Sequence, residues 1–296
     1  MNLEGKLAGW TARSSDTEQQ KQERAERMVR DAVRNHSAFS GCNLKVFAKG
    51  SYANNTNVKS DSDVDIAVKC MDVQYWEEHT DGAHPSGGGS YTGIWSPGKL
   101  RAELVAAMET KFPGEVDTSG STAIHVAATS SRVDIDVVPC FDFRYYLSNT
   151  SWRDGAKVFK KDGTEIVNYS EQQLAKGIDK NNRTGRSYKR TVRILKRLEN
   201  AMVESGHHRE VPSYFMECLA YNVPDSILKQ PTWTDTIKGT LAHVYNDLEG
   251  PEPADSDSRW VEVNEYKYLF FENQPWTRQD GRDFAYAGWK YLELDK

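Results

Sequence analysis

Two short segments that alternate carboxylates with aliphatic residues constrain the fold of this chain more than any other feature. Residues 63–68 read DVDIAV, and residues 133–138 read VDIDVV. Because successive side chains of a β-strand point to opposite faces, each segment places its carboxylates on one face and its aliphatic side chains on the other. The sequence therefore predicts two neighbouring core strands that gather acidic side chains on one surface: Asp63, Asp65, Asp134 and Asp136.

Carboxylates at this density repel one another unless a cation neutralises them. Hard divalent ions with oxygen ligands suit such a cluster, and a pair of them is the usual device for in-line phosphoryl transfer. Taken alone, a D-x-D motif on a strand more often marks only the solvent-exposed face of that strand. The second D-x-D and the preceding turn favour phosphate chemistry, because Gly50 lets the backbone approach a phosphate and Ser51 offers its hydroxyl and N–H. Asp61, at the strand's edge, is expected to matter less.

The pattern of the remaining chain predicts an α+β N-terminal half and a helical C-terminal half with a cleft between them. In the first half we expect helices over 16–36, capped by Asp16 or Thr17, and over 96–112, and strands over 44–50 and 64–70. Residues 144–180 are polar and are expected to be rich in loops.

The second half begins near residue 184 with the strongly amphipathic helix RSYKRTVRILKRLENAMVES. A further helix is expected after Pro212, with Ser213 as a candidate N-cap. Two domains follow from this pattern, residues 1–183 and residues 184–296.

Charge and composition exclude several classes of protein. A net charge of -5 over 296 residues offers little for a broad nucleic-acid groove. The chain shows neither an apolar run long enough to span a bilayer nor the apolar core of a signal peptide, so we expect a cytoplasmic protein with no stable nucleic-acid or membrane partner. Four widely spaced cysteines indicate buried free thiols.

The segments GSYANNTNVKSDSDVDI and VDIDVVPCFD resemble the signature of the polymerase-β-like nucleotidyltransferases. Together with PSYFMECLAYNVPDS they are most similar to the E clade of the bacterial cGAS/DncV-like nucleotidyltransferases. The resemblance implies a polymerase-β-like core in which Asp63, Asp65 and Asp136, in preference to Asp134, hold two Mg²⁺ ions, for which Mn²⁺ can substitute. One departure is Lys49, where many relatives are expected to carry Gln.

The resemblance also implies roles in nucleotide binding. Lys196 matches the lysine that reaches the triphosphate, and Lys189 and Arg193 support it. Ser213 would donate to a phosphate at a helix N-terminus, and Tyr214 would stack on a base. From the residues alone, the lysines would form a solvated helix face and Tyr214 would be a core aromatic.

Base choice depends on three further residues. Asn168, in the segment VNY, matches the base pocket of the clade, where Asn implies uridine and Ser implies purine. Its amide offers a donor and an acceptor that match O4 and N3–H of uracil. Gln274 and Trp276 resemble an element of pyrimidine-using members. From the residues alone, Asn168 would be a turn residue and Trp276 a packing residue.

These implications predict a template-independent cyclic dinucleotide synthase of bacterial antiphage (CBASS) signalling, whose product acts on a separate effector protein. UTP is the expected substrate, with ATP or CTP as possible second substrates, and cyclic di-UMP is the expected type of product. Asp136 is best placed to help deprotonate the attacking hydroxyl. Alternatives are a cyclic UMP–AMP synthase, an RNA or tRNA nucleotidyltransferase, and a nucleotide sensor with an inactive site. His125 is expected to be a surface or structural residue.

Overall fold

The computed structural model describes residues 2–13, 15–58, 63–84 and 90–295, and contacts divide the chain into two compact units. The sheet unit comprises Ser15–Ala53 and Lys59–Glu171, and the helical unit comprises Met1–Ser14, Asn54–Val58 and Gln172–Lys296. The long boundary thus falls at 171/172, earlier than the 183/184 expected from the sequence. The reason is that helix α5 (Ser170–Arg183) packs with the helical unit, where the Lys180 ammonium donates to the carbonyl of Val223 at 2.9 Å.

The sheet unit is built on seven strands in the order β1-β2-β5-β4-β3, with β6 paired to β5 and β7 paired to β6. The long central strands β2 (Val64–Glu78) and β5 (Ile135–Ser148) run parallel, and all other pairs are antiparallel. The shorter strands are β1 (Leu44–Ala48), β3 (Val116–Asp117), β4 (Ile124–Val126), β6 (Ser151–Phe159) and β7 (Glu165–Asn168).

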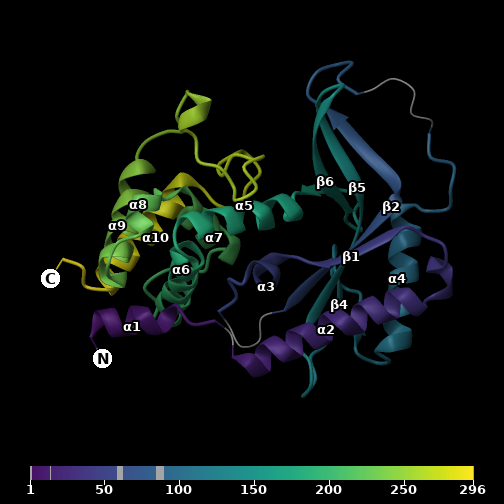
Figure 1. Cartoon of the computed structure of the whole chain (residues 1–296), viewed down its shortest axis with the longest axis horizontal. Helices are drawn as coiled ribbons and strands as arrows, with labels where there is room; N and C mark the ends of the chain where they lie inside the picture. Colours follow the sequence, from purple (N-terminus) through teal and green to yellow (C-terminus); the bar gives the residue numbers. More distant parts are fainter. Residues whose placement is uncertain (1, 14, 59–62, 85–89, 296) are drawn as a thin grey trace. The chain divides into compact units, whose positions relative to one another are not determined.

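Helices α2 (Asp16–Asn35) and α4 (Pro97–Lys111) lie together against one face of this sheet (Figure 1). The N-cap of α2 is Ser15, which forms a capping box with Glu18, so the expected caps Asp16 and Thr17 are wrong by one or two positions. Two short helices complete the unit, the 3-10 turn η1 (Ser37–Phe39) and α3 (Gly50–Asn54).

The two faces of the central strands differ as the alternation predicts. Val64, Ile66 and Val68 are fully buried in the cluster that also contains the apolar residues of α2 and α4. The opposite face of β2 and β5 carries a smaller apolar cluster, which includes Ala67 and Val138. The residues that alternate with the buried set at the start of both strands are carboxylates, so the acidic face is confirmed.

The expectation of loops over 144–180 is wrong, because this range holds the end of β5, β6, β7 and most of α5. Its charged side chains are paired across strands. Arg144 lies opposite Asp154 in the register and contacts its carboxylate at 3.1 Å, and the buried Lys157 pairs with Glu165 at 2.6 Å. Ion pairs between neighbouring strands let a polar sequence form sheet, and composition alone does not reveal them.

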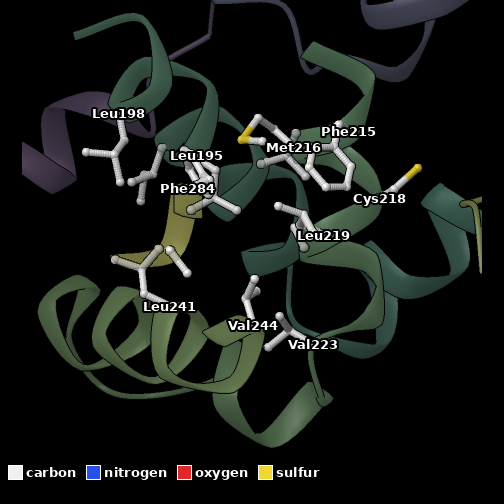
Figure 2. Close-up of a cluster of buried hydrophobic side chains, with 14 of the residues drawn as sticks. Leu195, Leu198, Phe215, Met216, Cys218, Leu219, Val223, Leu241, Val244 and Phe284 are labelled. Carbon is white, nitrogen blue, oxygen red and sulfur yellow. The ribbon is translucent and has the colours of Figure 1, made fainter. Parts of the chain in front are cut away.

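The helical unit packs α1 (Leu3–Trp10) and five later helices around one apolar core. Figure 2 shows part of this core, where Leu195, Phe215 and Phe284 meet from three different helices. The later elements are α6 (Ser187–Glu204), α7 (Ser213–Asn222), α8 (Asp225–Leu228), α9 (Trp233–Asp247), α10 (Arg278–Tyr291) and the 3-10 turn η2 (Ser256–Ser258).

Three further expectations from the sequence concern the cap of α7, the cysteines and membrane-spanning helices. Ser213 is the first residue of α7 and not its N-cap, a position that Pro212 occupies without a side-chain hydrogen bond. Cys70, Cys140 and Cys218 are buried free thiols, as expected, whereas Cys42 is only partly buried. Within the described residues, no helix is both long and apolar enough to cross a membrane.

Candidate active site

The carboxylates singled out in the sequence meet where β2 and β5 begin. Asp65 and Asp136 are direct partners in the parallel register of the two strands. Asp63 lies one residue before β2, and Asp134 precedes β5, where its carbonyl accepts the N–H of Val64 at 3.0 Å. Two neighbouring strands therefore present these carboxylates at one place in the sheet. Asp61 lies outside the described residues.

The charges of this group act on one another. The pKa of Asp63 is raised, first by partial burial and then by the negative charges of Asp136 and Asp134, although His125 opposes the shift. The part of this shift that comes from Asp136 and Asp134 is repulsion between carboxylates, which a bound cation would relieve. Such a site favours an added cation.

Asp65 is held by the turn that precedes it in the sheet. The backbone N–H of Lys49 donates to the Asp65 carbonyl at 2.9 Å, and the Lys49 ammonium lies 3.4 Å from the carboxylate oxygen Oδ1. Gly50 has a φ of +68°, and a Cβ at this position would lie 2.3 Å from Oδ2 of Asp65. Glycine is required here both for its backbone conformation and for the space that Asp65 occupies.

His125 is a contact of the site that the sequence analysis did not assign. It is the register partner of Asp136 on the antiparallel strand β4, and its Nδ1 lies 3.1 Å from Oδ1 of Asp136. Its Nε2 lies 3.4 Å from Asp134, which also accepts the N–H of Ala128 at 2.6 Å. The signal was the alternation Ile-His-Val, which places His125 on the polar face, but the pairing of β4 with β5 was needed to locate it.

The donor chemistry of Asp63, Asp65 and Asp136 fits a hard divalent ion, since each is a carboxylate and all come from adjacent strands. Their present arrangement is not a closed cage: among the described residues, no three acidic, histidine or cysteine side chains surround a point where an ion could sit. Lys49 and His125 instead contact two of the carboxylates.

Lys196 does not lie on a solvated helix face. The side chain is 4% exposed, and its ammonium lies 3.4 Å from the Thr56 hydroxyl and 3.8 Å from the Glu217 carboxylate. Burial lowers the pKa of Lys196, and the charge of Glu217 opposes that shift. Glu217 also accepts hydrogen bonds from Thr56 at 3.0 Å and Gln173 at 3.2 Å.

The two basic residues expected to assist Lys196 are also constrained by the fold. The Arg193 guanidinium donates to the carbonyls of Thr11 at 2.7 Å and Asn55 at 2.6 Å, so it ties the N-terminal segment and residues 54–58 into the helical unit. Burial, followed by nearby arginines, lowers its pKa to about 10. Burial also lowers the pKa of Lys189. Arg193 is therefore a structural brace in this arrangement.

Tyr214 and Gln274, distant in sequence, are joined by one buried carboxylate. Glu262 is 7% exposed and accepts a hydrogen bond from the Tyr214 hydroxyl at 3.3 Å and from Gln274 Nε2 at 2.8 Å. It also accepts one from Asn264 at 2.6 Å. Because a carboxylate only accepts, the NH₂ of Gln274 must face Glu262, which leaves the amide oxygen as the acceptor available to a ligand. Glu262 has no recognisable sequence signal.

Trp276 lies in the core, in accord with the packing interpretation of its sequence. It is 6% exposed, stacks on Phe215 with ring centroids 5.2 Å apart, and donates its indole N–H to the carbonyl of Leu269 at 2.9 Å. The ring centroids of Trp276 and Tyr214 lie 6.3 Å apart in an edge-to-face arrangement. Trp276 thus packs against Tyr214. Burial raises the pKa of the Tyr214 hydroxyl.

Ser51 and Asn168 complete the candidate residues, both in the sheet unit. Ser51 follows Gly50 in α3 and is partly buried. Asn168 ends the edge strand β7 opposite Ala156, so it is a strand residue and not part of a turn. The Asn168 carbonyl lies close to Gly155, where a Cβ would come within 3.1 Å of it.

Comparison with known proteins gives the family. Residues 175–293 match the model of the cGAS/DncV-like nucleotidyltransferase C-terminal helical domain. Over 294 residues, and 98% of both chains, the sequence is 35% identical to the cyclic dipyrimidine nucleotide synthase CdnE of Cecembia lonarensis. The chain belongs to the CdnE-type cGAS/DncV-like nucleotidyltransferases.

Other CdnE-type proteins agree with this assignment. The cyclic dipurine nucleotide synthase of Elizabethkingia meningoseptica is 32% identical over 98% of both chains. The Rhodothermus marinus CdnE c-UMP-AMP synthase, solved with Apcpp and Upnpp, has the same fold with a TM-score of 0.83 at 24% identity, covering 99% of this chain and 97% of that one. The protein is thus a nucleotidyltransferase of the cyclic dinucleotide synthase class, and the expected fold is confirmed.

Proposed function

We propose that this CdnE-type enzyme joins two nucleoside triphosphates, with UTP preferred, into a cyclic dipyrimidine such as cyclic di-UMP. The main support for nucleotidyl-transfer activity is the register pairing of Asp65 with Asp136 on the parallel strands β2 and β5. It places two carboxylates side by side, next to Asp63, where hard cations and a triphosphate are accommodated.

Asp63, Asp65 and Asp136 would hold two Mg²⁺ ions, with Mn²⁺ as a substitute. When bound, such ions neutralise the triphosphate and acidify a ribose hydroxyl. Asp136 accepts the proton of that hydroxyl, which attacks the α-phosphorus as pyrophosphate leaves. The turn at Gly50 and Ser51 holds phosphate oxygens through backbone N–H and hydroxyl groups. A second transfer, after the linear product has turned round, closes the ring.

Residues of the helical unit serve the nucleotide. Lys196 supplies positive charge to the leaving pyrophosphate by exchanging Thr56 and Glu217 for phosphate oxygens. Ser213, exposed at the N-terminus of α7, donates to a phosphate. Tyr214 offers the face of its ring to a base, while Trp276 supports that ring from the core.

The preference for uracil rests on amide groups. Asn168, at the end of β7, presents a donor and an acceptor that match O4 and N3–H of uracil. Gln274, turned by Glu262, offers an acceptor to a base N–H. Overall similarity does not decide the base, because the dipyrimidine and dipurine relatives are 35% and 32% identical. Individual residues that contact the base must therefore determine which base the enzyme selects.

Cyclic UMP–AMP is the second candidate product. The Rhodothermus c-UMP-AMP synthase, solved with Apcpp and Upnpp, is an enzyme of this fold that joins one uridine and one adenosine nucleotide. With either product we place the enzyme in antiphage signalling, where the cyclic dinucleotide acts on a separate effector protein. A net charge of -5 disfavours the RNA or tRNA nucleotidyltransferase alternative.

Competition among all four triphosphates at equal concentration, with Mg²⁺ and mass analysis of the product, tests the base preference. We expect uridine in every product. The variant Asn168→Ser should lose preference for UTP and gain purine incorporation, whereas Asn181→Ser, on α5 in the helical unit, should leave the product unchanged. Exclusive use of ATP and GTP by the unmodified enzyme would exclude the uracil assignment and leave the nucleotidyltransferase intact.

A further inference from the structure

We propose that Lys49 is an internal counter-ion of Asp65 that opposes metal binding until a nucleotide draws the ammonium away. The proposal rests on the function proposed above, in which Asp65 is a metal ligand.

The position of Lys49 is fixed by the sheet. It follows the last residue of β1, Ala48, which pairs with Ile66 of β2 in the register. Its backbone N–H donates to the Asp65 carbonyl at 2.9 Å, so the two residues are tied at the backbone before the side chains meet. The Lys49 side chain is 19% exposed and its ammonium lies 3.4 Å from Oδ1 of Asp65.

Both oxygens of Asp65 are directed toward this turn. Oδ1 contacts Lys49, and Oδ2 lies so close to Gly50 that any side chain there would collide with it. A carboxylate whose charge is balanced by an ammonium is less available to coordinate an ion, so the pairing of Asp65 with Lys49 acts against metal binding.

Other lysines of the sheet unit have different partners. Lys45, on the preceding strand β1, pairs with Glu171, and Lys157 pairs with Glu77 and Glu165. None of those carboxylates belongs to the proposed metal site. Lys49 is distinct because its partner does, so its charge acts directly against an ion at Asp65.

A triphosphate carries several negative charges and competes for the ammonium of Lys49. Once the ammonium pairs with phosphate, Asp65 can coordinate the metal that arrives with the nucleotide. Lys49 therefore couples metal binding to nucleotide binding, and a neutral residue at this position uncouples the two.

The test is titration of the full-length, nucleotide-free protein with Mn²⁺, with free Mn²⁺ measured by electron paramagnetic resonance at fixed ionic strength. For Lys49→Gln we expect a dissociation constant lower by about tenfold, the effect of removing one positive charge a few ångströms from a dication at a partly exposed site. Lys49→Arg, which keeps the charge, should bind Mn²⁺ as the unmodified protein does.

Lys45→Gln is the matched control, since it removes the same charge from β1, the strand that leads into Lys49, but leaves Asp65 untouched. The double variant Lys49→Gln/Asp65→Asn should lose the gain, because the freed ligand is then absent. Thermal melting identifies any variant that fails to fold, and Lys49→Met serves as a second neutral variant.

Equal Mn²⁺ affinities for Lys49→Gln, Lys49→Met and Lys45→Gln would overturn the proposal. So would a gain that persists in the double variant, because the effect would then not pass through Asp65. Failure of the proposed function is separate: it would appear as absence of any cyclic dinucleotide from the unmodified enzyme with Mg²⁺ and all four triphosphates.

Discussion

Replacing Lys196 by Met should destabilise the helical unit, and the size of the effect follows from its surroundings. The side chains of Lys196 and Glu217 are 4% and 3% exposed, so removing the ammonium leaves a buried carboxylate without its cation. Breaking a buried ion pair from one side typically costs about 3–5 kcal/mol. Glu217 keeps hydrogen bonds from Thr56 and Gln173, so we expect the lower end, about 3 kcal/mol.

The solvated helix face that the residues alone suggested for Lys196 would give a different result. A solvent-facing lysine would affect the KM for the nucleotide with little effect on folding. Because Lys196 is buried against Glu217, its replacement should affect both, and a kinetic assay alone would confuse the two effects.

Urea unfolding followed by far-UV circular dichroism measures the free energy of unfolding of each variant. Glu217→Gln removes the carboxylate charge that Lys196→Met leaves buried without a cation. The double variant Lys196→Met/Glu217→Gln should therefore recover at least about half of the lost free energy of unfolding, as expected for a coupled pair. Arg190→Met, at an exposed position of the same helix α6, is the control. If the free energy of unfolding of Lys196→Met lies within about 0.5 kcal/mol of the value for the unmodified protein, the effect is that of an ordinary surface substitution. The assignment of a buried ion pair is then refuted.

Three further predictions address the site and the fold. Asp65→Ala should stay folded and lose at least roughly a hundredfold in product formation, the scale of losing one strong electrostatic stabiliser; near-full activity would contradict the metal assignment. Glu262→Gln frees the amide of Gln274 to turn over, so four-nucleotide competition should show a changed product ratio with synthesis retained, and an unchanged ratio would mean that Gln274 does not read the base. Burial alone would raise the pKa of Asp225, but Lys180 and Arg183 outweigh it and lower this pKa. Asp225→Asn should therefore destabilise the protein at neutral pH, and chemical denaturation should show the difference shrinking as the pH falls from about 4, the unfolded value, through the lower folded pKa; a pH-independent difference would exclude this linkage.

Local sequence was sufficient where a structure repeats over a few residues. The alternation in DVDIAV and VDIDVV gave the orientation of Asp65 and Asp136, because a strand has a period of two whatever surrounds it. The sequence also predicted the bounds of α2, α4 and α6 to within a few residues, because an amphipathic helix repeats its apolar positions with the helical period. The family, too, was recognisable from short motifs, and full-length comparison confirmed it.

Contacts between distant segments decided what the sequence could not. His125 reaches Asp136 only because β4 pairs with β5, and Tyr214 meets Gln274 only through Glu262. Lys196 has the same local pattern as a solvated lysine, yet Thr56 and Glu217 enclose it. Burial and the charge of a side chain's neighbours depend on which segments the fold brings together, and no periodicity along the chain records that.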